Sequence, residues 1–470
     1  MDILTQLRAA IGPDNVLTGE ATAKWQSDWM GAYHLDPIAV LRPANTTQVA
    51  AVMQIAHASG TPVTPVSGNT GLVGGTQAKG ALMLSLDRMN AIRDIRPDAR
   101  IAVVESGVIL STLHEAAATH DLIFPLSFGA RGSAMIGGVL STNAGGSNVL
   151  RYGNTRDLCL GLEVVLADGR IMDLMSELHK DNSGYDLRNL LIGAEGTLGV
   201  ITAAVMKLRP KPRAYATAMV AVPSIADALT LLNAMQDITG GAVEAFEYMP
   251  RSYIQGHVDR IAGAREPFDV PHDVNILIEI AATSPRDATA ADDGRVPVVA
   301  LLEDTLAAML ENGTLLDAVI AQNETQRAEM WARREAAAEI SHGVKPFVDT
   351  DIALPLDKVA TFFDLIAPRL KALDPDAAEL SVAHLGDGNI HFSMYPTSSD
   401  PALHDAMMEA VEDLVQDLRG SFSAEHGIGT SKLSSMARRK DPVALDVMRA
   451  IKSALDPKGI LNPDKVLPKR

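Results

Sequence analysis

The segment SVAHLGDGNIHFSMY, residues 381–395, contains two histidines whose spacing suits metal chemistry. In a helix, His384 and His391 would share one face, but Gly386 and Gly388 between them disfavour a helix. We therefore expect two strands joined by a tight turn, which brings both imidazoles to one side. A pair placed in this way is either a candidate site for a divalent metal or two hydrogen-bonded structural histidines.

The segment SAEHGIG, residues 423–429, supplies the acidic residue that such a metal would need. A catalytic zinc site uses three protein ligands and keeps a further position open. Glu425 is the candidate for the third ligand, and His426 follows it directly. A metal-dependent hydrolase that activates water at His384, His391 and Glu425 is one function compatible with these residues.

Three glycine-rich stretches form the second chemical feature, and the first is PVSGNTGLVGGT at residues 65–76. Glycines let a backbone turn tightly and present N–H groups to a phosphate. Similar stretches lie at residues 129–165 and 186–202, and the sequence contains neither a P-loop nor an early-strand G-x-G-x-x-G fingerprint. One such stretch is compatible with an ordinary turn, whereas three in one domain indicate a single long ligand wrapped by several loops.

These stretches, followed by H-x-G-D-G-N-x-H at residues 384–391 and E-H-G-I-G at residues 425–429, resemble the FAD-binding oxidoreductases of the vanillyl-alcohol-oxidase type. Within that type the chain is most similar to the branch of D-2-hydroxyglutarate and FAD-linked D-lactate dehydrogenases. The resemblance implies an FAD cofactor, with its pyrophosphate at the first stretch and its flavin along the second. The residues that the resemblance assigns to FAD are Val66, Ser67, Gly68, Asn69, Thr70, Gly71, Gly74, Gly75, Ser133, Gly137, Gly138, Thr142, Gly145, Glu195, Ile201 and Asn462.

The resemblance also assigns a catalytic set. His384, His391 and Glu425 would bind a divalent metal, usually zinc, with manganese or cobalt as alternatives. His426 would act as the base. Arg334, which the pattern W-x-x-R-E selects, would bind the substrate carboxylate, because a guanidinium offers a planar fork. Without that pattern, Arg334 would be interpreted as a solvated arginine on a helix.

The implied reaction explains the need for both a metal and a base. Oxidation of a D-2-hydroxy acid moves a hydride to flavin N5 and removes the hydroxyl proton. The hydroxyl resembles water, with a pKa of ~15.7, whereas histidine titrates near ~6.5, a gap that corresponds to about 12 kcal/mol. Coordination lowers the pKa of a bound water to roughly 7, and a hydroxyl acidified in this way would be matched to His426.

Three positions depart from the pattern of the hydroxyglutarate-specific members. Those members have a threonine one helical turn after the arginine, a lysine shortly before D-x-x-L-P, and an asparagine two residues after the second histidine. Here the places read Ala338, Asp349 and Ser393, so three contacts to the second carboxylate of the substrate are missing. Lys345 or His342 is a candidate replacement.

Other functions remain open at this stage. An oxidase that passes electrons to oxygen would need the same motifs as a dehydrogenase, and the resemblance favours electron-transfer flavoprotein or a quinone as the acceptor. A hydrolase would bind a nucleotide substrate at the glycine loops, and a tightly bound yellow cofactor would argue against it. A flavin-fold binding protein without turnover would keep the loops and would need neither metal nor base.

The elements that must position these residues indicate an α+β fold. Helical spacing with a glycine stop predicts a helix near residues 46–60, and two apolar runs joined by Asp168 and Gly169 predict a β-hairpin. After the proline-bearing segment KLRPKPRAY the pattern of strands and helices changes. We expect a two-part FAD-binding domain at residues 1–211 and a substrate or cap domain at residues 212–435. The latter would carry the metal site and an antiparallel sheet, and a C-terminal helical segment at residues 436–470 would return to the FAD domain.

The composition sets further limits. A length of 470 residues exceeds one ordinary core, and a formal net charge of −17 argues against nucleic-acid binding. Cys159 is the single cysteine, so it is expected to be a buried structural thiol in a reducing compartment. Neither a signal-peptide pattern nor an apolar run of ~18 residues occurs, so we expect a cytoplasmic protein without a transmembrane segment. The resemblance adds a homodimer.

Overall fold

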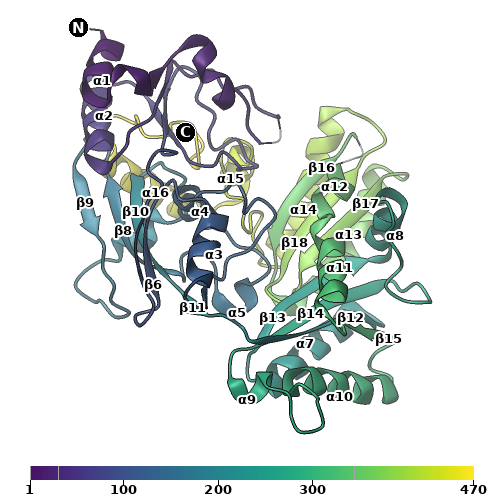
Figure 1. Cartoon of the computed structure of the whole chain (residues 1–470). Coiled ribbons are helices and arrows are strands. Elements are labelled where there is room, and N and C mark those ends of the chain that lie inside the picture. Colours follow the sequence, from purple (N-terminus) through teal and green to yellow (C-terminus); the bar gives the residue numbers. More distant parts are fainter. Residues whose placement is uncertain (1, 30, 343–344, 470) are drawn as a thin grey trace. The chain divides into compact units, whose positions relative to one another are not determined.

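The computed structural model describes residues 2–29, 31–342 and 345–469, and the side chain of His342 lies outside the description (Figure 1). The chain forms two compact units. The first contains Met1–Gly145, Gly153–Pro210 and Glu425–Arg470, and the second contains Gly146–Tyr152 and Lys211–Ala424. The three predicted domain ranges stay a prediction; this division assigns residues 146–152 to the second unit and residues 425–435 to the first.

Two larger sheets organise the first unit, and β7 and β11 form a further two-stranded antiparallel sheet. In the four-stranded sheet, β1 pairs antiparallel with β2, whereas β2, β4 and β3 are parallel. The five-stranded sheet is antiparallel, with the order β5-β6-β10-β8-β9. The strands are β1 (Val16–Leu17), β2 (Ala39–Leu41), β3 (Val63–Val66), β4 (Leu82–Ser85), β5 (Ile92–Arg96), β6 (Ile101–Glu105), β8 (Cys159–Val165), β9 (Ile171–Leu174) and β10 (Val200–Lys207).

Local sequence signals explain the elements of this unit. Helix α2 (Thr46–Ser59) begins at Asn45, whose side chain accepts a hydrogen bond from the Gln48 amide, and it ends at Gly60 in the left-handed conformation. The predicted hairpin joins β8 and β9 through Gly169, with φ of 84°. The other described elements of the unit are α1 (Ile3–Ile11), η1 (Pro13–Asn15), η2 (Gly19–Trp25), α3 (Leu110–Ala118), β7 (Leu122–Ile123), α4 (Ile136–Thr142), α6 (Leu187–Leu191), β11 (Arg209–Pro210), α15 (Leu433–Arg439) and α16 (Pro442–Leu455).

The second unit is built on one antiparallel sheet of seven strands, in the order β15-β12-β14-β13-β17-β18-β16. Its strands are β12 (Ala214–Val222), β13 (Val243–Pro250), β14 (Val274–Ala282), β15 (Asp317–Ile320), β16 (Val348–Ala353), β17 (Ala378–His384) and β18 (Asn389–Tyr395). Its helices are α5 (Val149–Tyr152), α7 (Ile225–Thr239), α8 (Arg251–Arg260), α9 (Pro285–Ala288), α10 (Pro297–Glu311), α11 (Glu324–Glu335), α12 (Ala337–His342), η3 (Leu356–Lys358), α13 (Val359–Leu373) and α14 (Pro401–Asp417).

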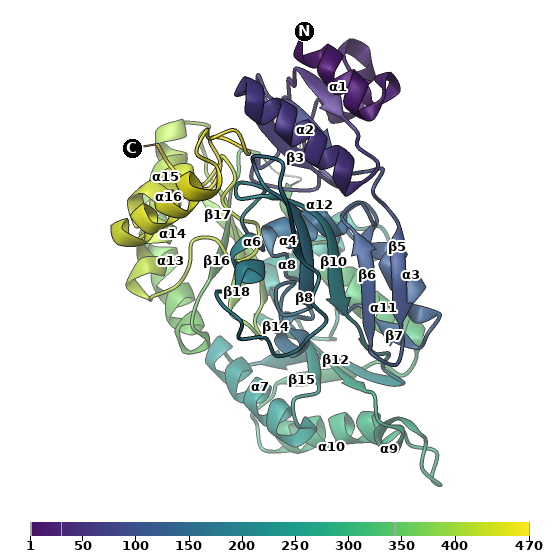
Figure 2. The same ribbon diagram turned by 90° about the vertical axis from the view of Figure 1, so that its left-hand side faces the viewer.

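Helices cover both faces of this sheet (Figures 1 and 2). On one face, α7, α10, α13 and α14 pack on alternate strand residues such as Ala218 and Val220. On the other face, α8, α11 and α12 pack on the intervening residues, among them Met219 and Ala221. Because both faces are covered, a central strand such as β14 is buried along its whole length.

The predicted α+β class and the antiparallel sheet are confirmed. Cys159 is buried, as expected, and burial raises the pKa of its thiol to about 12. Among the described residues, no helix combines the length and apolar character needed to span a membrane.

Candidate active site

The two histidines lie on neighbouring strands of the second unit. In the pairing of β17 with β18, His384 stands opposite Asn389 and His391 stands opposite Val382. Residues two apart on a strand point to the same face, so the register places both imidazoles on one side. Their ring centroids are 5.4 Å apart, and the ring planes are inclined at 82°. The expectation of two strands and a tight turn is thus confirmed.

The turn between these strands depends on Gly388. Its φ is 81°, and a Cβ added there would collide with the carbonyl oxygen of Leu354. The next residue, Asn389, donates from Nδ2 to Asp351 Oδ1 and to the Ile352 carbonyl, each at 3.0 Å. The turn is therefore tied to strand β16.

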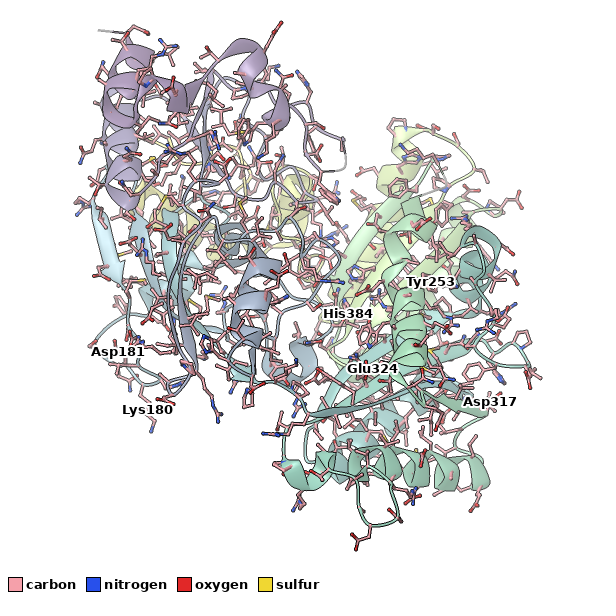
Figure 3. All side chains as sticks on the ribbon, in the orientation of Figure 1. Lys180, Asp181, Tyr253, Asp317, Glu324 and His384 are labelled. Carbon is pink, nitrogen blue, oxygen red and sulfur yellow. The ribbon has the colours of Figure 1, made fainter. Side chains whose placement is uncertain are left out.

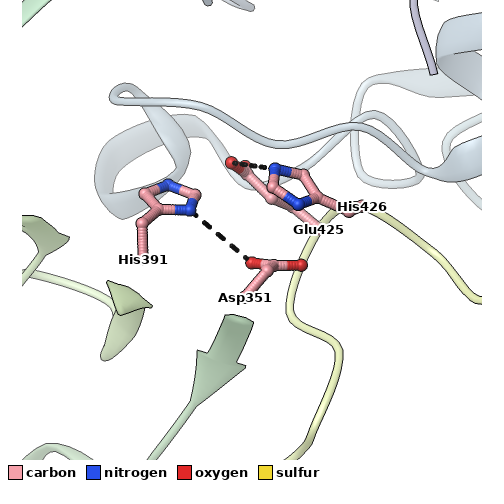
Figure 4. Close-up of side chains that lie close together, drawn as sticks. All are labelled: Asp351, His391, Glu425 and His426. Carbon is pink, nitrogen blue, oxygen red and sulfur yellow. Dashed lines mark ion pairs between the residues drawn. The ribbon is translucent and has the colours of Figure 1, made fainter. Parts of the chain in front are cut away.

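Asp351 is a residue of the site that the sequence analysis did not select. It lies on β16 directly opposite His391, and its side chain is almost fully buried. Asp351 Oδ1 is 3.9 Å from His391 Nδ1 (Figure 4). The signal in the sequence was a carboxylate that opens the D-x-x-L-P pattern at the end of an apolar strand.

Glu247 is the second residue that the sequence analysis missed. It lies on β13 opposite His384 and is completely buried. Its Oε1 is 2.9 Å from His384 Nδ1, and its Oε2 accepts a 2.8 Å hydrogen bond from Arg334 Nε. Burial alone would raise the pKa of Glu247, but His384 and Arg334 outweigh it and lower that pKa. The signal was the presence of charged residues, Glu244 and Glu247, inside the largely apolar strand AVEAFEYM.

Arg334 lies near the end of α11 and is buried, not solvated. Tyr253 on α8, labelled in Figure 3, donates its hydroxyl to the carbonyl of Arg333 at 2.6 Å and so anchors this turn of the helix. The Nη2 atom of Arg334 is buried and has no hydrogen-bond partner among the described residues. A buried N–H group without a partner is costly, so this atom is suited to an anionic ligand.

Glu425 and His426 begin the last segment of the first unit. The residue before them, Ala424, donates its backbone N–H to the Asp351 carbonyl at 3.1 Å and to Asp351 Oδ2 at 3.2 Å. Consecutive Cα atoms are about 3.8 Å apart, so chain connectivity keeps the backbone of Glu425 close to strand β16. Within the segment, His426 Nε2 is 4.0 Å from Glu425 Oε1, and Figure 4 draws both side chains with Asp351 and His391. All four are of residue types that bind divalent metals.

The loop that follows His426 is held by Glu195. The two carboxylate oxygens of Glu195 accept hydrogen bonds from the backbone N–H groups of Ile428 at 2.7 Å and Gly429 at 2.8 Å. A Cβ at Gly427 would lie 2.7 Å from Glu195 Oε1, so the close approach requires glycine. Burial raises the pKa of Glu195, against the lowering effect of the two N–H groups. A place along FAD for Glu195 stays a prediction.

The three glycine-rich stretches meet in the first unit. A Cβ at Gly68 would collide with the Ser133 carbonyl, and one at Gly137 would lie 2.9 Å from Ser67 Oγ, so the first two stretches approach each other closely. Bonds from Asn462 Nδ2 to the carbonyls of Gly75 at 3.0 Å and Glu195 at 2.8 Å tie the tail to the first and third stretches. The side-chain Oδ1 of Asn462 is buried without a partner among the described residues.

The remaining predicted FAD residues fall on these stretches or next to them. Asn69 has a left-handed backbone, with φ of 54°, and its side chain bonds Ser27 and Thr76. The others are Val66 at the end of β3, Thr70, Gly71, Gly74, Gly138 and Thr142 on α4, Gly145, and Ile201 on β10. Glycine-rich loops that approach one another this closely form a cradle that fits a phosphate-bearing ligand, because such loops bind phosphate through backbone N–H groups.

Two of the three positions that depart from the family pattern bond each other. Asp349 stands opposite Ser393 in the pairing of β16 with β18, two residues along each strand from Asp351 and His391. The Ser393 hydroxyl donates to Asp349 Oδ1 at 2.8 Å. A carboxylate therefore occupies this position on the face that carries the histidines. The third position, Ala338, lies on α12.

Known protein families match both parts of the chain. The family described as FAD linked oxidases, C-terminal domain, matches residues 211–466, and the family described as FAD binding domain matches residues 37–175. The chain is 36% identical over 448 residues to the mitochondrial D-2-hydroxyglutarate dehydrogenase of Bos taurus, covering 94% of this chain and 79% of that protein. It is 35% identical over 445 residues to a D-2-hydroxyglutarate dehydrogenase of Xanthomonas citri pv. viticola, covering 93% of this chain and 91% of that protein.

The fold has counterparts among solved structures. The crystal structure of p-cresol methylhydroxylase with substrate bound superposes with a TM-score of 0.73 at 17% sequence identity, covering 98% of this chain and 96% of that chain. At this identity, the likeness shows a shared fold.

Proposed function

The chain belongs to the FAD-linked oxidases and is a homologue of the D-2-hydroxyglutarate dehydrogenases, and from that premise we propose that it is a metal-assisted dehydrogenase of D-2-hydroxy acids. The substrate is D-2-hydroxyglutarate, D-lactate or a similar acid, and the product is the 2-oxo acid. The observation that carries the proposal is the pair His384 and His391 on one sheet face, next to a buried arginine linked to His384 through Glu247.

The metal ligands in this proposal are His384, His391 and Glu425. The two imidazoles and a carboxylate form a donor set that zinc accepts, with a further position left for substrate. A carboxylate on the second ring nitrogen, as Glu247 supplies to His384, is the usual partner of a metal-binding histidine. When bound there, zinc, manganese or cobalt supplies the Lewis acidity that lowers the pKa of the substrate hydroxyl.

The side chains of this chain carry out the other roles. Arg334 binds the substrate carboxylate through the guanidinium edge that includes the unpaired Nη2 atom. His426 accepts the hydroxyl proton, and the hydrogen bonds that Glu195 accepts from the N–H groups of Ile428 and Gly429 fix the loop that presents it. The glycine-rich cradle would hold FAD, which when bound there would supply the hydride acceptor, flavin N5.

The proposal next concerns whether the substrate carries a second carboxylate. The relatives carry names that refer to D-2-hydroxyglutarate. In this chain, Ala338, Asp349 and Ser393 offer no cation to a second carboxylate, and the bonded pair of Asp349 and Ser393 presents a carboxylate itself. These residues favour a monocarboxylic acid over 2-hydroxyglutarate, because two carboxylates close together repel each other.

The test is the loss of visible flavin absorption under anaerobic conditions, with zinc present, after addition of D-2-hydroxyglutarate or D-lactate to separate samples. Bleaching by lactate or a larger monocarboxylic acid alone is the expected result. Bleaching by hydroxyglutarate alone would mean that other groups bind the second carboxylate. A protein purified without flavin would contradict the proposal and favour the metal-dependent hydrolase.

The acceptor and the assembly complete the proposal. We propose that electron-transfer flavoprotein or a quinone reoxidises the flavin of a cytoplasmic homodimer. Oxygen consumption during turnover distinguishes the alternative, an oxidase acting on the same acids, because only an oxidase would consume one oxygen molecule for each acid oxidised.

A further inference from the structure

One buried carboxylate contacts both a proposed metal ligand and the proposed substrate-binding arginine. Glu247 places Oε1 2.9 Å from His384 Nδ1 and Oε2 2.8 Å from Arg334 Nε. We propose that Glu247 is a positioning residue that orients a metal ligand and the substrate-binding arginine together. This inference rests on the proposed function, since it takes His384 as a ligand and Arg334 as the carboxylate-binding residue.

The contact with His384 determines which ring nitrogen is available. A carboxylate accepts, so the hydrogen bond places the imidazole proton on Nδ1. In the neutral ring, Nε2 then carries the lone pair that a metal needs, and the ring cannot rotate without breaking the bond. Glu247 lies opposite His384 in the pairing of β13 with β17, so the sheet itself fixes the distance between the two side chains.

The contact with Arg334 determines which guanidinium edge is available. Glu247 occupies Nε, while the buried Nη2 has no partner among the described residues. The end of the guanidinium that carries Nη2 is therefore the part that can bind a substrate carboxylate. Glu247 thus fixes the orientation of the Arg334 guanidinium relative to the His384 imidazole.

A second buried glutamate shows what a purely structural ion pair looks like in the same sheet. Glu279 on the adjacent strand β14 directs both oxygens to one arginine, with Arg327 Nε at 2.7 Å and Nη2 at 2.8 Å. It also accepts from Trp331 Nε1 at 2.9 Å. Glu247 instead serves an arginine and a histidine: both of its oxygens lie 2.9 Å from His384 Nδ1, and Oε2 also accepts from Arg334 Nε at 2.8 Å. Contact with a histidine as well as an arginine distinguishes a shared positioning group from a structural bidentate pair.

The experiment compares Glu247→Gln with the matched control Glu279→Gln. Glutamine has one acceptor oxygen, so it can serve only one of the two donors. An amide NH₂ facing His384 would favour the proton on Nε2 and block metal binding. The FAD-loaded proteins are stripped of metal and titrated with Zn²⁺ in competition with a chromogenic chelator. We expect Glu247→Gln to bind Zn²⁺ roughly 10–100-fold more weakly than wild type, and Glu279→Gln to bind within about twofold of wild type.

Any of three results would overturn the inference. One is wild-type Zn²⁺ affinity in Glu247→Gln, and another is an equal loss in Glu279→Gln, which would indicate a general effect of breaking a buried ion pair. A wild-type protein that takes up no Zn²⁺ would overturn it as well. If Glu247→Gln misfolds, Glu247→Asp replaces it, because its carboxylate is one methylene too short to reach both partners and should also weaken Zn²⁺ binding.

A double-mutant comparison tests whether Glu247 acts through His384. In a His384→Ala background, adding Glu247→Gln should cause no further loss of Zn²⁺ affinity, because the ligand that it orients is gone. An additional tenfold loss would overturn the inference. Flavin reduction by a panel of 2-hydroxy acids is measured in parallel on wild type. If no acid reduces the flavin while Glu247→Gln still weakens Zn²⁺ binding, the reaction proposed above fails and the positioning role stands.

Discussion

Three buried carboxylates on strands of the seven-stranded sheet control the geometry of the second unit. Glu247, Glu279 and Asp351 are each at most 3% exposed, and each accepts hydrogen bonds from named donors. An unpaired buried carboxylate would be very costly, so each is held by its partners in one orientation. At the residue scale, the site is therefore fixed by charged groups with no freedom to rearrange.

The base can be tested at the same scale. Replacing His426 by alanine should leave FAD bound and slow flavin reduction by ~10²-fold or more, since a general base contributes about that factor. Stopped-flow absorbance under anaerobic conditions measures the rate. His120, an exposed histidine of the same unit, provides the control, and His120→Ala should reduce at the wild-type rate. A near-normal rate in His426→Ala would remove it from the role of base.

At the scale of elements, the register of strands β13, β17, β18 and β16 assembles the site. Local signals predicted the histidine pair, because Gly386 and Gly388 lie between the two histidines in sequence and make a turn the favoured conformation. Glu247 could not be predicted in the same way, because 137 residues separate it from His384 and only the pairing of β13 with β17 brings them together. Strand pairing over such a separation leaves no local pattern in the sequence.

The turn that joins β17 and β18 gives a prediction about this element. Gly388→Ala should destabilise the protein by about 2–4 kcal/mol, the sum of a left-handed backbone and an overpacked contact with Leu354. It should also weaken Zn²⁺ binding by displacing His384 from His391. Gly263, with φ of 80° and open space around its Cβ, is the matched control, and Gly263→Ala should cost only ~1–2 kcal/mol and leave Zn²⁺ binding unchanged. Urea unfolding and Zn²⁺ titration measure both effects, and equal losses in the two variants would contradict the explanation.

At the scale of the whole molecule, the chain passes between the two units four times, after residues 145, 152, 210 and 424. The change of pattern near the prolines at 210 and 212 was visible in the sequence. The short excursion at residues 146–152 was not, because it lies inside a glycine-rich stretch whose other parts belong to the first unit. Only the structure shows its role, because there Arg151 donates a hydrogen bond to Glu244 at 2.9 Å.

The last passage between the units, after residue 424, gives a prediction at this scale. A chain that ends at Ala424 keeps every segment of the second unit but lacks residues 425–470 of the first. It should be purified without flavin, because Asn462 no longer ties Gly75 to Glu195. Removing only Lys469 and Arg470 is the control and should leave the visible flavin spectrum intact. A full complement of FAD in the chain ending at Ala424 would show that the tail is dispensable for the cofactor.

This arrangement has a consequence for biosynthesis. The ribosome makes residues 1–145 first, yet the unit that they begin is completed only by the final 46 residues of the chain. The second unit, by contrast, has all its segments once residue 424 has emerged. Domains fold as units while synthesis proceeds, so the part of the molecule that is started first is expected to be finished last. Flavin capture then becomes possible only once residues 425–470 have been made, and a product terminated before residue 425 would be recognisable as colourless protein.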